Sequence, residues 1–163
     1  MKNIFLILVL VLTTTIVKCQ TKANIITPIE FYNIKINNTT LNELNNTKGN
    51  KDLIEKLFNA SINETTIDFD YCDYTYNGFE IGFSNEQISG FNITNNKWSM
   101  TIKGKTIKIG DSINNLGNVI FNTQINGNKS ITYSACDGCN NWITIQFNQV
   151  TKEITKIYYI EQT

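Results

Sequence analysis

Histidine and arginine are both absent from the 163-residue chain, and proline occurs once. The absence of histidine excludes the Ser-His and Cys-His pairs that activate most nucleophiles, and it removes the commonest metal ligand. The absence of arginine leaves no planar side chain that can clamp a phosphate or a carboxylate through two hydrogen bonds. We therefore expect a protein that is not an enzyme and has neither a cofactor nor a bound metal.

Net positive charge is missing as well. The 14 lysines are balanced by 14 aspartate and glutamate residues, so the formal net charge is zero. Nucleic-acid binding calls for a basic face, and anionic membrane surfaces attract clusters of basic residues. Neither nucleic acid nor a membrane surface is therefore expected as a partner.

A hydrophobic run of roughly 20 residues, the length that spans a bilayer, is absent too. The apolar run from Ile4 to Leu12 follows Lys2 and gives way to three threonines. This pattern is typical of a secretory signal peptide, so we predict a signal peptide at residues 1–19 and a mature chain that begins after Cys19. The alternative keeps Cys19 as a lipidated first residue that anchors the protein to an outer membrane. Both interpretations place the protein outside the cytoplasm, either secreted or periplasmic.

What the chain does contain is an internal repeat. At an offset of 64 residues, Cys72 aligns with Cys136, and the alternating apolar patterns that follow also align. Repeated patterns in a fixed order indicate duplicated structural units. We interpret them as a tandem duplication, with a first unit at residues 20–96 and a second unit at residues 97–163.

Each unit is predicted to contain a strand, a helix cap, a helical segment and three closing strands. In the first unit the strand is expected at Pro28–Ile36 and the cap at Asn38-Thr39. The helical segment is expected as two pieces, Leu41–Asn46 and Lys51–Asn59. The second piece has an apolar stripe of Leu53, Ile54, Leu57 and Phe58. In the second unit they are expected at Met100–Ile109, Asp111-Ser112 and a stripe of Ile113, Leu116 and Ile120.

The closing strands set the predicted fold class. Asn77-Gly78 between alternating apolar runs is a strong β-hairpin signal. Pairing Tyr76 with Phe79 turns one apolar set toward the helices: Cys72, Tyr74, Tyr76, Phe79, Ile81 and Phe83. The same alternation turns Ile143, Ile145 and Phe147 inward in the second unit. The prediction is an α+β fold of two tandem units, each a short helical segment packed on an antiparallel β-sheet.

The segment IKIGDSINNLGN at residues 107–118, followed by a hairpin and a last strand, resembles the small outer-membrane assembly lipoproteins of the BamE (SmpA/OmlA) type. Two such units in tandem resemble the β-lactamase inhibitor protein. The resemblance covers Pro28 to Ile160 as a pattern and implies a secreted or periplasmic protein-binding scaffold without catalysis. It assigns no binding residue.

Cysteine is scarce, and the predicted mature chain retains Cys72, Cys136 and Cys139. Three cysteines without histidine do not make a zinc site. Asp137-Gly138 is a two-residue turn signal, which predicts a Cys136–Cys139 disulfide at a hairpin tip. One alternative is a turn at Asn140-Asn141 with a bridge from Cys72. Another is thiol–disulfide activity through Cys136 and Cys139, although an alternating strand follows them instead of the helix that activates such thiols.

A second candidate for chemistry is the acidic stretch that contains Asp68, Asp70 and Asp73. A calcium loop needs a glycine bend and a later glutamate. This stretch instead alternates like a strand, which indicates a solvated strand face.

Two aromatic residues are the better candidates for function. By alternation, Trp142 and Tyr158 point away from the helices, and exposed Trp and Tyr are frequent anchors of protein interfaces. A polar surround is predicted from Glu80, Thr144, Gln146 and Lys156. The alternation leaves open whether this face is free or covered by the sheet of the other unit.

These features predict a secreted or periplasmic, non-catalytic module that binds another protein, of an inhibitor or immunity type. The alternative is a structural component of the cell envelope that is anchored through a lipid on Cys19 and serves the assembly of other proteins. In that alternative the lipid is the only link to the membrane.

Overall fold

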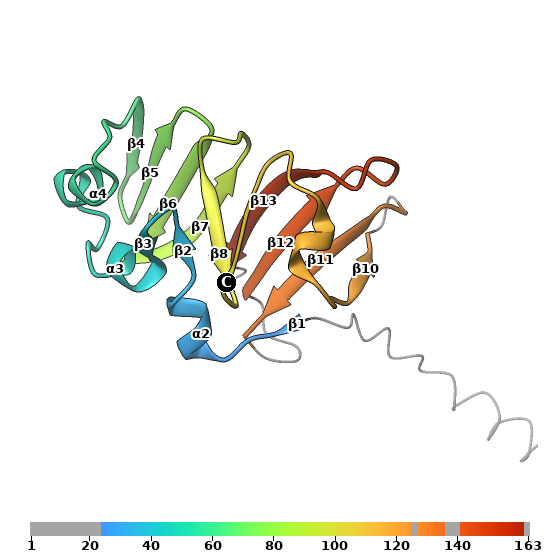
Figure 1. Cartoon of the computed structure of the whole chain (residues 1–163). Helices are drawn as coiled ribbons and strands as arrows, with labels where there is room; N and C mark the ends of the chain where they lie inside the picture. Colours follow the sequence, from blue (N-terminus) through green and yellow to red (C-terminus); the bar gives the residue numbers. More distant parts are fainter. Residues whose placement is uncertain (1–23, 125–126, 136–140, 162–163) are drawn as a thin grey trace, which may run out of the picture.

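The computed structural model describes residues 24–124, 127–135 and 141–161. The predicted signal peptide, Cys19, Cys136 and Cys139 lie outside these residues. Within them the fold is mixed α/β with strands predominating, in agreement with the coarse prediction (Figure 1). No helix in the described ranges has the length and apolar character needed to cross a membrane.

The larger of two sheets has nine strands in the order β1-β11-β12-β13-β7-β6-β5-β4, with β10 also paired to β11. Neighbouring strands run antiparallel except for β1 and β11. The strands are β1 (Asn24–Ile25), β4 (Glu64–Asp68), β5 (Tyr71–Tyr76), β6 (Phe79–Ser84), β7 (Gln87–Ile93), β10 (Phe121–Thr123), β11 (Lys129–Ser134), β12 (Asn141–Phe147) and β13 (Ile154–Glu161).

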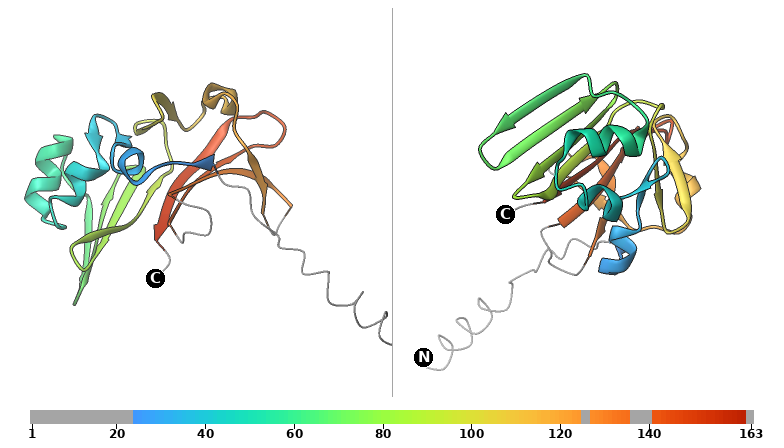
Figure 2. Two further views of the ribbon diagram at one scale, coloured as in Figure 1. Left: turned by 90° about the horizontal axis from the view of Figure 1, so that it is seen from below. Right: turned by 90° about the vertical axis from the view of Figure 1, so that its left-hand side faces the viewer.

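The smaller sheet has the order β3-β2-β8-β9. Its strands are β2 (Lys35–Ile36), β3 (Thr39–Thr40), β8 (Ser99–Ile102) and β9 (Lys105–Lys108). The helices are α2 (Pro28–Tyr32), α3 (Leu41–Asn45), α4 (Lys51–Phe58) and the 3₁₀ helix η1 (Ile113–Leu116). Figure 2 (left) shows the large sheet as an arch, with the helices and the small sheet on its upper side.

The strands β7 and β13 join the two halves of the large sheet edge to edge, with Phe91 opposite Tyr159 and Ile93 opposite Ile157. One possibility left open by the sequence, that the two sheets cover each other face to face, is therefore wrong. The outer face of the sheet, which points away from the helices, continues from one half into the other.

The hydrophobic core lies between the large sheet and the layer of helices and small sheet. Its first half is dominated by an aromatic cluster of Phe58, Tyr76, Phe79 and Trp98, in which the Phe79 and Trp98 ring centroids lie 4.6 Å apart. The Trp98 indole N–H donates to the backbone oxygen of Asn77 at 3.0 Å. This bond ties the cluster to the β5–β6 turn and satisfies the indole donor, as a buried tryptophan requires.

The predicted hairpin and its inward face are confirmed. Tyr76 pairs with Phe79 across Asn77-Gly78. The residues predicted to face inward on β5 and β6 are buried, except Cys72, which is half-buried. Ile143, Ile145 and Phe147 are buried in the second half as predicted.

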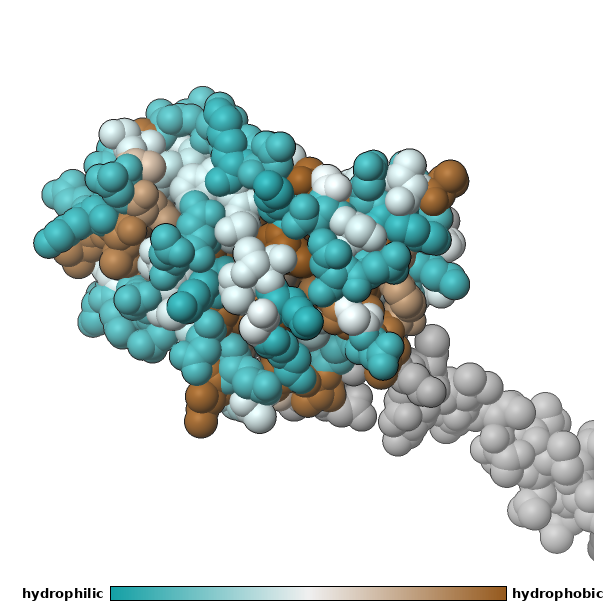
Figure 3. Space-filling view, in the orientation of Figure 1, coloured by the Kyte–Doolittle hydropathy of each residue, from teal (hydrophilic) through white to brown (hydrophobic). Residues whose placement is uncertain are grey.

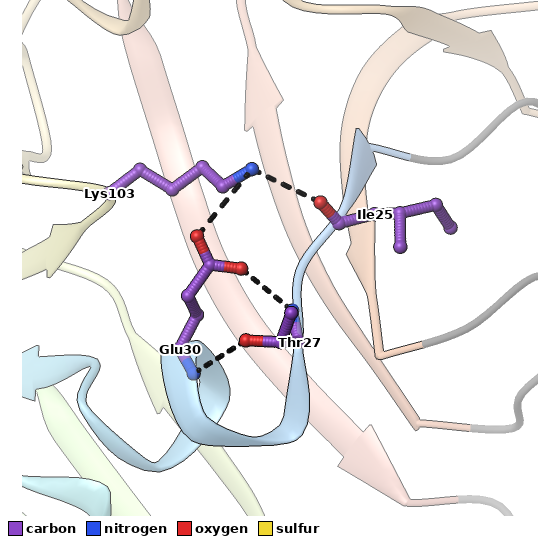
Figure 4. Close-up of polar contacts among 4 residues, drawn as sticks. All are labelled: Ile25, Thr27, Glu30 and Lys103. Atoms are coloured by element: carbon purple, nitrogen blue, oxygen red, sulfur yellow. Dashed lines mark hydrogen bonds and ion pairs between the residues drawn. The ribbon is translucent and has the colours of Figure 1, made fainter.

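The prediction of a strand at Pro28–Ile36 is wrong for most of its length, because α2 occupies its start. Thr27 caps this helix: its hydroxyl accepts from the Glu30 amide at 3.2 Å, and the Glu30 carboxylate accepts from the Thr27 amide at 2.7 Å. This reciprocal arrangement is a capping box, and proline suits the first helical position. Lys103 then donates to the Ile25 oxygen at 3.1 Å and lies 3.9 Å from Glu30 (Figure 4).

The predicted strand Met100–Ile109 is instead the hairpin β8–β9. Lys103 (φ 49°) and Gly104 (φ 72°) form its turn, and positive φ at both central residues matches the twist of hairpin strands. Lysine at the first of these positions gives a weaker sequence signal than asparagine does. This is why the alternating residues on both sides were interpreted as one strand.

Both predicted helical pieces of the first half are confirmed as α3 and α4. The cap of α3 is Thr40 rather than Asn38-Thr39, because the Thr40 hydroxyl accepts from the Glu43 amide at 3.1 Å. Of the predicted stripe on α4 only Ile54 is fully buried. Figure 3 shows a hydrophobic area at this end of the molecule, and Leu53 and Leu57 remain 47% and 37% exposed.

In the second half, Ser112 caps η1 as predicted by accepting from the Asn114 amide at 3.3 Å. Ile113 and Leu116 are buried. The inclusion of Ile120 in the same stripe is wrong. The 3₁₀ helix ends at Leu116, and Ile120 lies beyond it with 43% of its surface exposed.

Candidate functional site

The outer face of the large sheet carries a hollow of about 820 Å³. Residues from six strands line it: β4, β5, β6 and β7 of the first half and β12 and β13 of the second. Figure 2 (left) shows that, among the described residues, no helix or strand covers this side of the arch. The β7–β13 pairing therefore creates a surface to which both halves contribute.

Four of the six residues predicted for binding line this hollow: Glu80, Gln146, Lys156 and Tyr158. The strand register explains why they meet. Glu80 and Tyr158 are both register partners of Asn92 on β7, and Gln146 is the partner of Lys156. The structure thus brings together residues that lie up to about half the chain apart in sequence.

The other two predicted residues lie outside the lining. Trp142 is the register partner of Ile160, which does line the hollow, and Trp142 is 37% exposed. Thr144 was expected to be exposed, but it is only 7% exposed. Its side chain is short, it lies in an interior strand, and its register partner is the larger Tyr158. Thr144 is therefore poorly placed to contact a partner directly.

Two glycines in the middle of strands line the hollow. Gly82 on β6 and Gly90 on β7 are register partners. A Cβ atom on Gly82 would collide with the Asp73 carboxylate, and one on Gly90 would lie 3.0 Å from the backbone oxygen of Tyr159. These glycines were missed in the sequence, although an isolated glycine inside a strand pattern is a signal for a bulge or a close approach.

Two polar side chains, those of Tyr71 and Asp73, lie over Gly82. The Tyr71 hydroxyl donates to the Asp73 carboxylate. This hydrogen bond, with burial and the negative charge of Asp73, raises the pKa of Tyr71 to about 12. The Tyr71 hydroxyl holds the Asp73 carboxylate in place through this hydrogen bond.

Asn92 lines the hollow from β7, where the two halves of the sheet pair. Its Nδ2 donates to Glu80 Oε2 at 3.2 Å. Its Oδ1 is buried and has no hydrogen-bond partner among the described residues. An oxygen in this state is costly unless something donates to it, so a donor from a ligand or a water molecule would be stabilising here.

Charge is distributed unevenly over the outer face. The first half contributes carboxylates from Asp73 and Glu80 and no lysine from β4, β5 or β6. The second half contributes Lys156, whose Nζ lies 5.2 Å from the centre of the Tyr158 ring. The hollow is thus acidic on one side and aromatic with one cation on the other.

The predicted disulfide Cys136–Cys139 lies outside the described residues. The strands that lead to it are described, however, and they pair Ser134 with Trp142. A two-residue turn at Asp137-Gly138 would pair Ser134 with Asn141 instead, so the expected register is shifted by one residue. The competing turn at Asn140-Asn141 does not fit either, because β12 begins at Asn141.

Cys72 is free and half-buried on the inner side of β5. Its Sγ lies 3.9 Å from the backbone oxygen of Gly49, and it packs against the core as expected of a small hydrophobic residue. Its proposed equivalence with Cys136 does not follow the strand pairing. Cys72 pairs with Phe83 within its hairpin, whereas Cys136 comes two residues after Ser134, the last residue of β11.

No group of three or more potential metal-ligating side chains occurs in residues 24–124, 127–135 and 141–161. The acidic stretch contributes Asp68 at the end of β4, Asp70 in the turn and Asp73 on β5. The carboxylate of Asp68 accepts from the Phe69 amide at 3.0 Å. These residues form a hairpin, as the alternating pattern indicated in part.

No family model, curated protein or solved structure matches this chain. The assignment of a function therefore depends on the site alone.

Proposed function

We propose that the protein is a non-catalytic protein-binding module that acts outside the cytoplasm and uses the hollowed outer face of its large sheet. The observation that carries the proposal is the hollow itself, which joins Glu80 of one half to Gln146, Lys156 and Tyr158 of the other. Aromatic anchors within a polar surround are typical of a protein interface.

The aromatic side of the hollow supports an anchoring role. Tyr158 lines the hollow, and Trp142 and Ile160 lie beside each other as register partners, 37% and 48% exposed. Removing such apolar surface from water favours association. The acidic side, with Asp73 and Glu80, supplies the polar contacts that fix orientation.

We further propose that the two halves are tandem units, as the sequence repeat suggests. Two β-bulges support this: one lies between Gly82 and Phe83, the other between Gln146 and Phe147, 64 residues later. Bulges are specific structural features rather than random defects. The strands β7 and β13 are the last strands of the two halves, and Asn92 on one pairs directly with Tyr158 on the other. The pairs on either side exchange roles, Phe91 with Tyr159 and Ile93 with Ile157. This is expected for two similar units related by a twofold axis.

The test uses site-specific photocrosslinking in the native host. A photoreactive residue replaces Tyr158, and a second version carries it at Val150, which is 88% exposed in the β12–β13 turn. The proposal expects an adduct with another protein from position 158 and not from position 150.

The captured partner is then tested with Trp142→Ala and Tyr158→Ala. We expect each variant to weaken binding at least tenfold while the thermal unfolding midpoint stays within a few degrees of wild type, and Val150→Ala to bind normally. The proposal fails if binding is unchanged, or if it is lost only because the variants unfold.

A further inference from the structure

The large sheet has one long free edge, strand β4. Within the described residues β4 pairs with β5 alone, whereas at the other end of the sheet β1 and β10 both pair with β11. All five residues of β4 are exposed, and Figure 1 shows the strand at the outer end of the sheet. An edge of this kind presents unpaired backbone donors and acceptors that can pair with another chain.

The pairing pattern shows which backbone groups of β4 point outward. Asp70, the residue directly before β5, faces β6, because the Asn85 amide donates to its backbone oxygen at 2.9 Å. Backbone groups alternate in direction along an antiparallel strand, so Asp73 faces β4, where its register partner is Thr66. The residues on either side of Thr66 direct their N–H and C=O groups away from the sheet: Thr65 and Ile67.

The two faces beside this edge differ in chemistry. On the outer face, β4 carries the carboxylates of Glu64 and Asp68, and no lysine occurs between residues 64 and 84. On the other face, Ile67 is 74% exposed and Phe69 is 98% exposed. They border a cavity of about 360 Å³ whose other walls include Cys72, Phe83 and the ion-paired side chains of Lys48 and Glu86.

We propose that β4 is a docking edge for an extended segment of another protein in which apolar and basic residues alternate. Such a segment adds a strand to the sheet through the backbone groups of Thr65 and Ile67, which supply affinity without regard to sequence. Because side chains alternate between faces, its apolar residues enter the cavity beside Ile67, and its lysines or arginines face Glu64 and Asp68. Of β4 only Thr66 lines the hollow, whereas the pairing proposed here uses the backbone of Thr65 and Ile67, so the inference does not depend on the proposed function.

A second copy of this chain is a poorer occupant of the edge. The antiparallel register that pairs all five residues of β4 with their copies is centred on Thr66. In that register Glu64 of each copy lies directly opposite Asp68 of the other, and like charges in this position are destabilising. A basic strand places opposite charges there instead.

The test measures binding of a short, end-blocked peptide of alternating valine and lysine to the full chain by NMR, with a valine–glutamate peptide for comparison. We expect the lysine peptide to shift the amide signals of Thr65 and Ile67 and to slow their hydrogen exchange. Raising the salt concentration should weaken binding, because exposed charges are screened. The glutamate peptide should bind at least tenfold more weakly.

Three variants separate the contributions. Thr65→Pro removes an outward N–H and leaves the β4–β5 pairing intact, so affinity should fall at least tenfold. Glu64→Lys combined with Asp68→Lys, both at exposed positions, should reverse the preference toward the glutamate peptide. Glu80→Lys is the control: it replaces a carboxylate by lysine in the hollow rather than on β4. It should leave peptide binding unchanged.

Equal binding of both peptides, or shifts around Glu80 rather than β4, would overturn the proposal. Self-association that Thr65→Pro abolishes would also overturn it, by identifying a second copy as the occupant. If Thr65→Pro fails to fold, the double lysine variant decides the question by itself.

Discussion

Single glycines fix the tightest points of this fold, and Gly78 is the most constrained of them. Its φ is 83°, and a Cβ atom there would overlap the side chain of Asn95. Gly104 has a similar φ of 72° but nothing within 4 Å. We expect Gly78→Ala to lower the unfolding free energy by roughly 1–3 kcal/mol and Gly104→Ala to cost less, as measured by urea denaturation. Equal losses would show that the contact with Asn95 is unimportant.

Tyr71 makes stability depend on pH in the alkaline range. Its pKa is raised to about 12, first by its hydrogen bond to Asp73, and an unfolded tyrosine has a pKa of about 10. Between these values the unfolded state binds fewer protons than the folded state, so the contribution is complete below pH 10 and is lost as pH rises through about 12. Asp73→Asn should make this decline shallower in denaturation series across that range. An unchanged slope would exclude Tyr71 as its source.

Among the elements, two short helices share the same capping box but differ in what they bury. Helix α3 buries Leu41 and Leu44, whereas α2 buries no residue completely. Thr40→Ala should therefore lower global stability by about 1 kcal/mol. Thr27→Ala should mainly increase hydrogen exchange within α2. If both substitutions lowered global stability equally, α2 would be as firmly docked as α3.

The elements also show how far the sequence predicts this fold. Strands with clear alternation and an Asn-Gly turn, such as β5 and β6, are predicted correctly because one face is buried and the turn sets the register. The sequence from Thr27 to Glu30 contains a capping-box signal, but the apolar residues after Pro28 outweighed it in the prediction of a strand.

The candidate site was predicted only in part, for a different reason. Alternation gives the face on which Glu80, Gln146, Lys156 and Tyr158 lie, and this part was correct. It does not reveal that β7 and β13 are neighbours, since their pairing joins residues far apart in the chain. The hollow depends on that pairing, because residues of both halves line it.

For the molecule as a whole, the β7–β13 seam predicts that both halves unfold together. Tyr159 packs at the seam, with its ring centroid 5.7 Å from Phe91 and 5.2 Å from Phe31. The two tryptophans report on separate halves, because Trp98 packs in the aromatic cluster of the first half and Trp142 lies on β12. Single-tryptophan proteins, made with Trp98→Phe or Trp142→Phe, therefore allow each half to be followed by fluorescence.

We expect Tyr159→Ala to lower the unfolding free energy by about 3–5 kcal/mol, as for other large buried aromatic residues. In both single-tryptophan backgrounds the denaturation midpoint should fall by the same amount, because a continuous sheet with one core unfolds as a unit. Each midpoint is compared with that of its own background, so the cost of the tryptophan substitution cancels. Unequal falls in the two backgrounds would contradict the prediction and would mean that each half folds on its own, with the seam contributing only an interface between them.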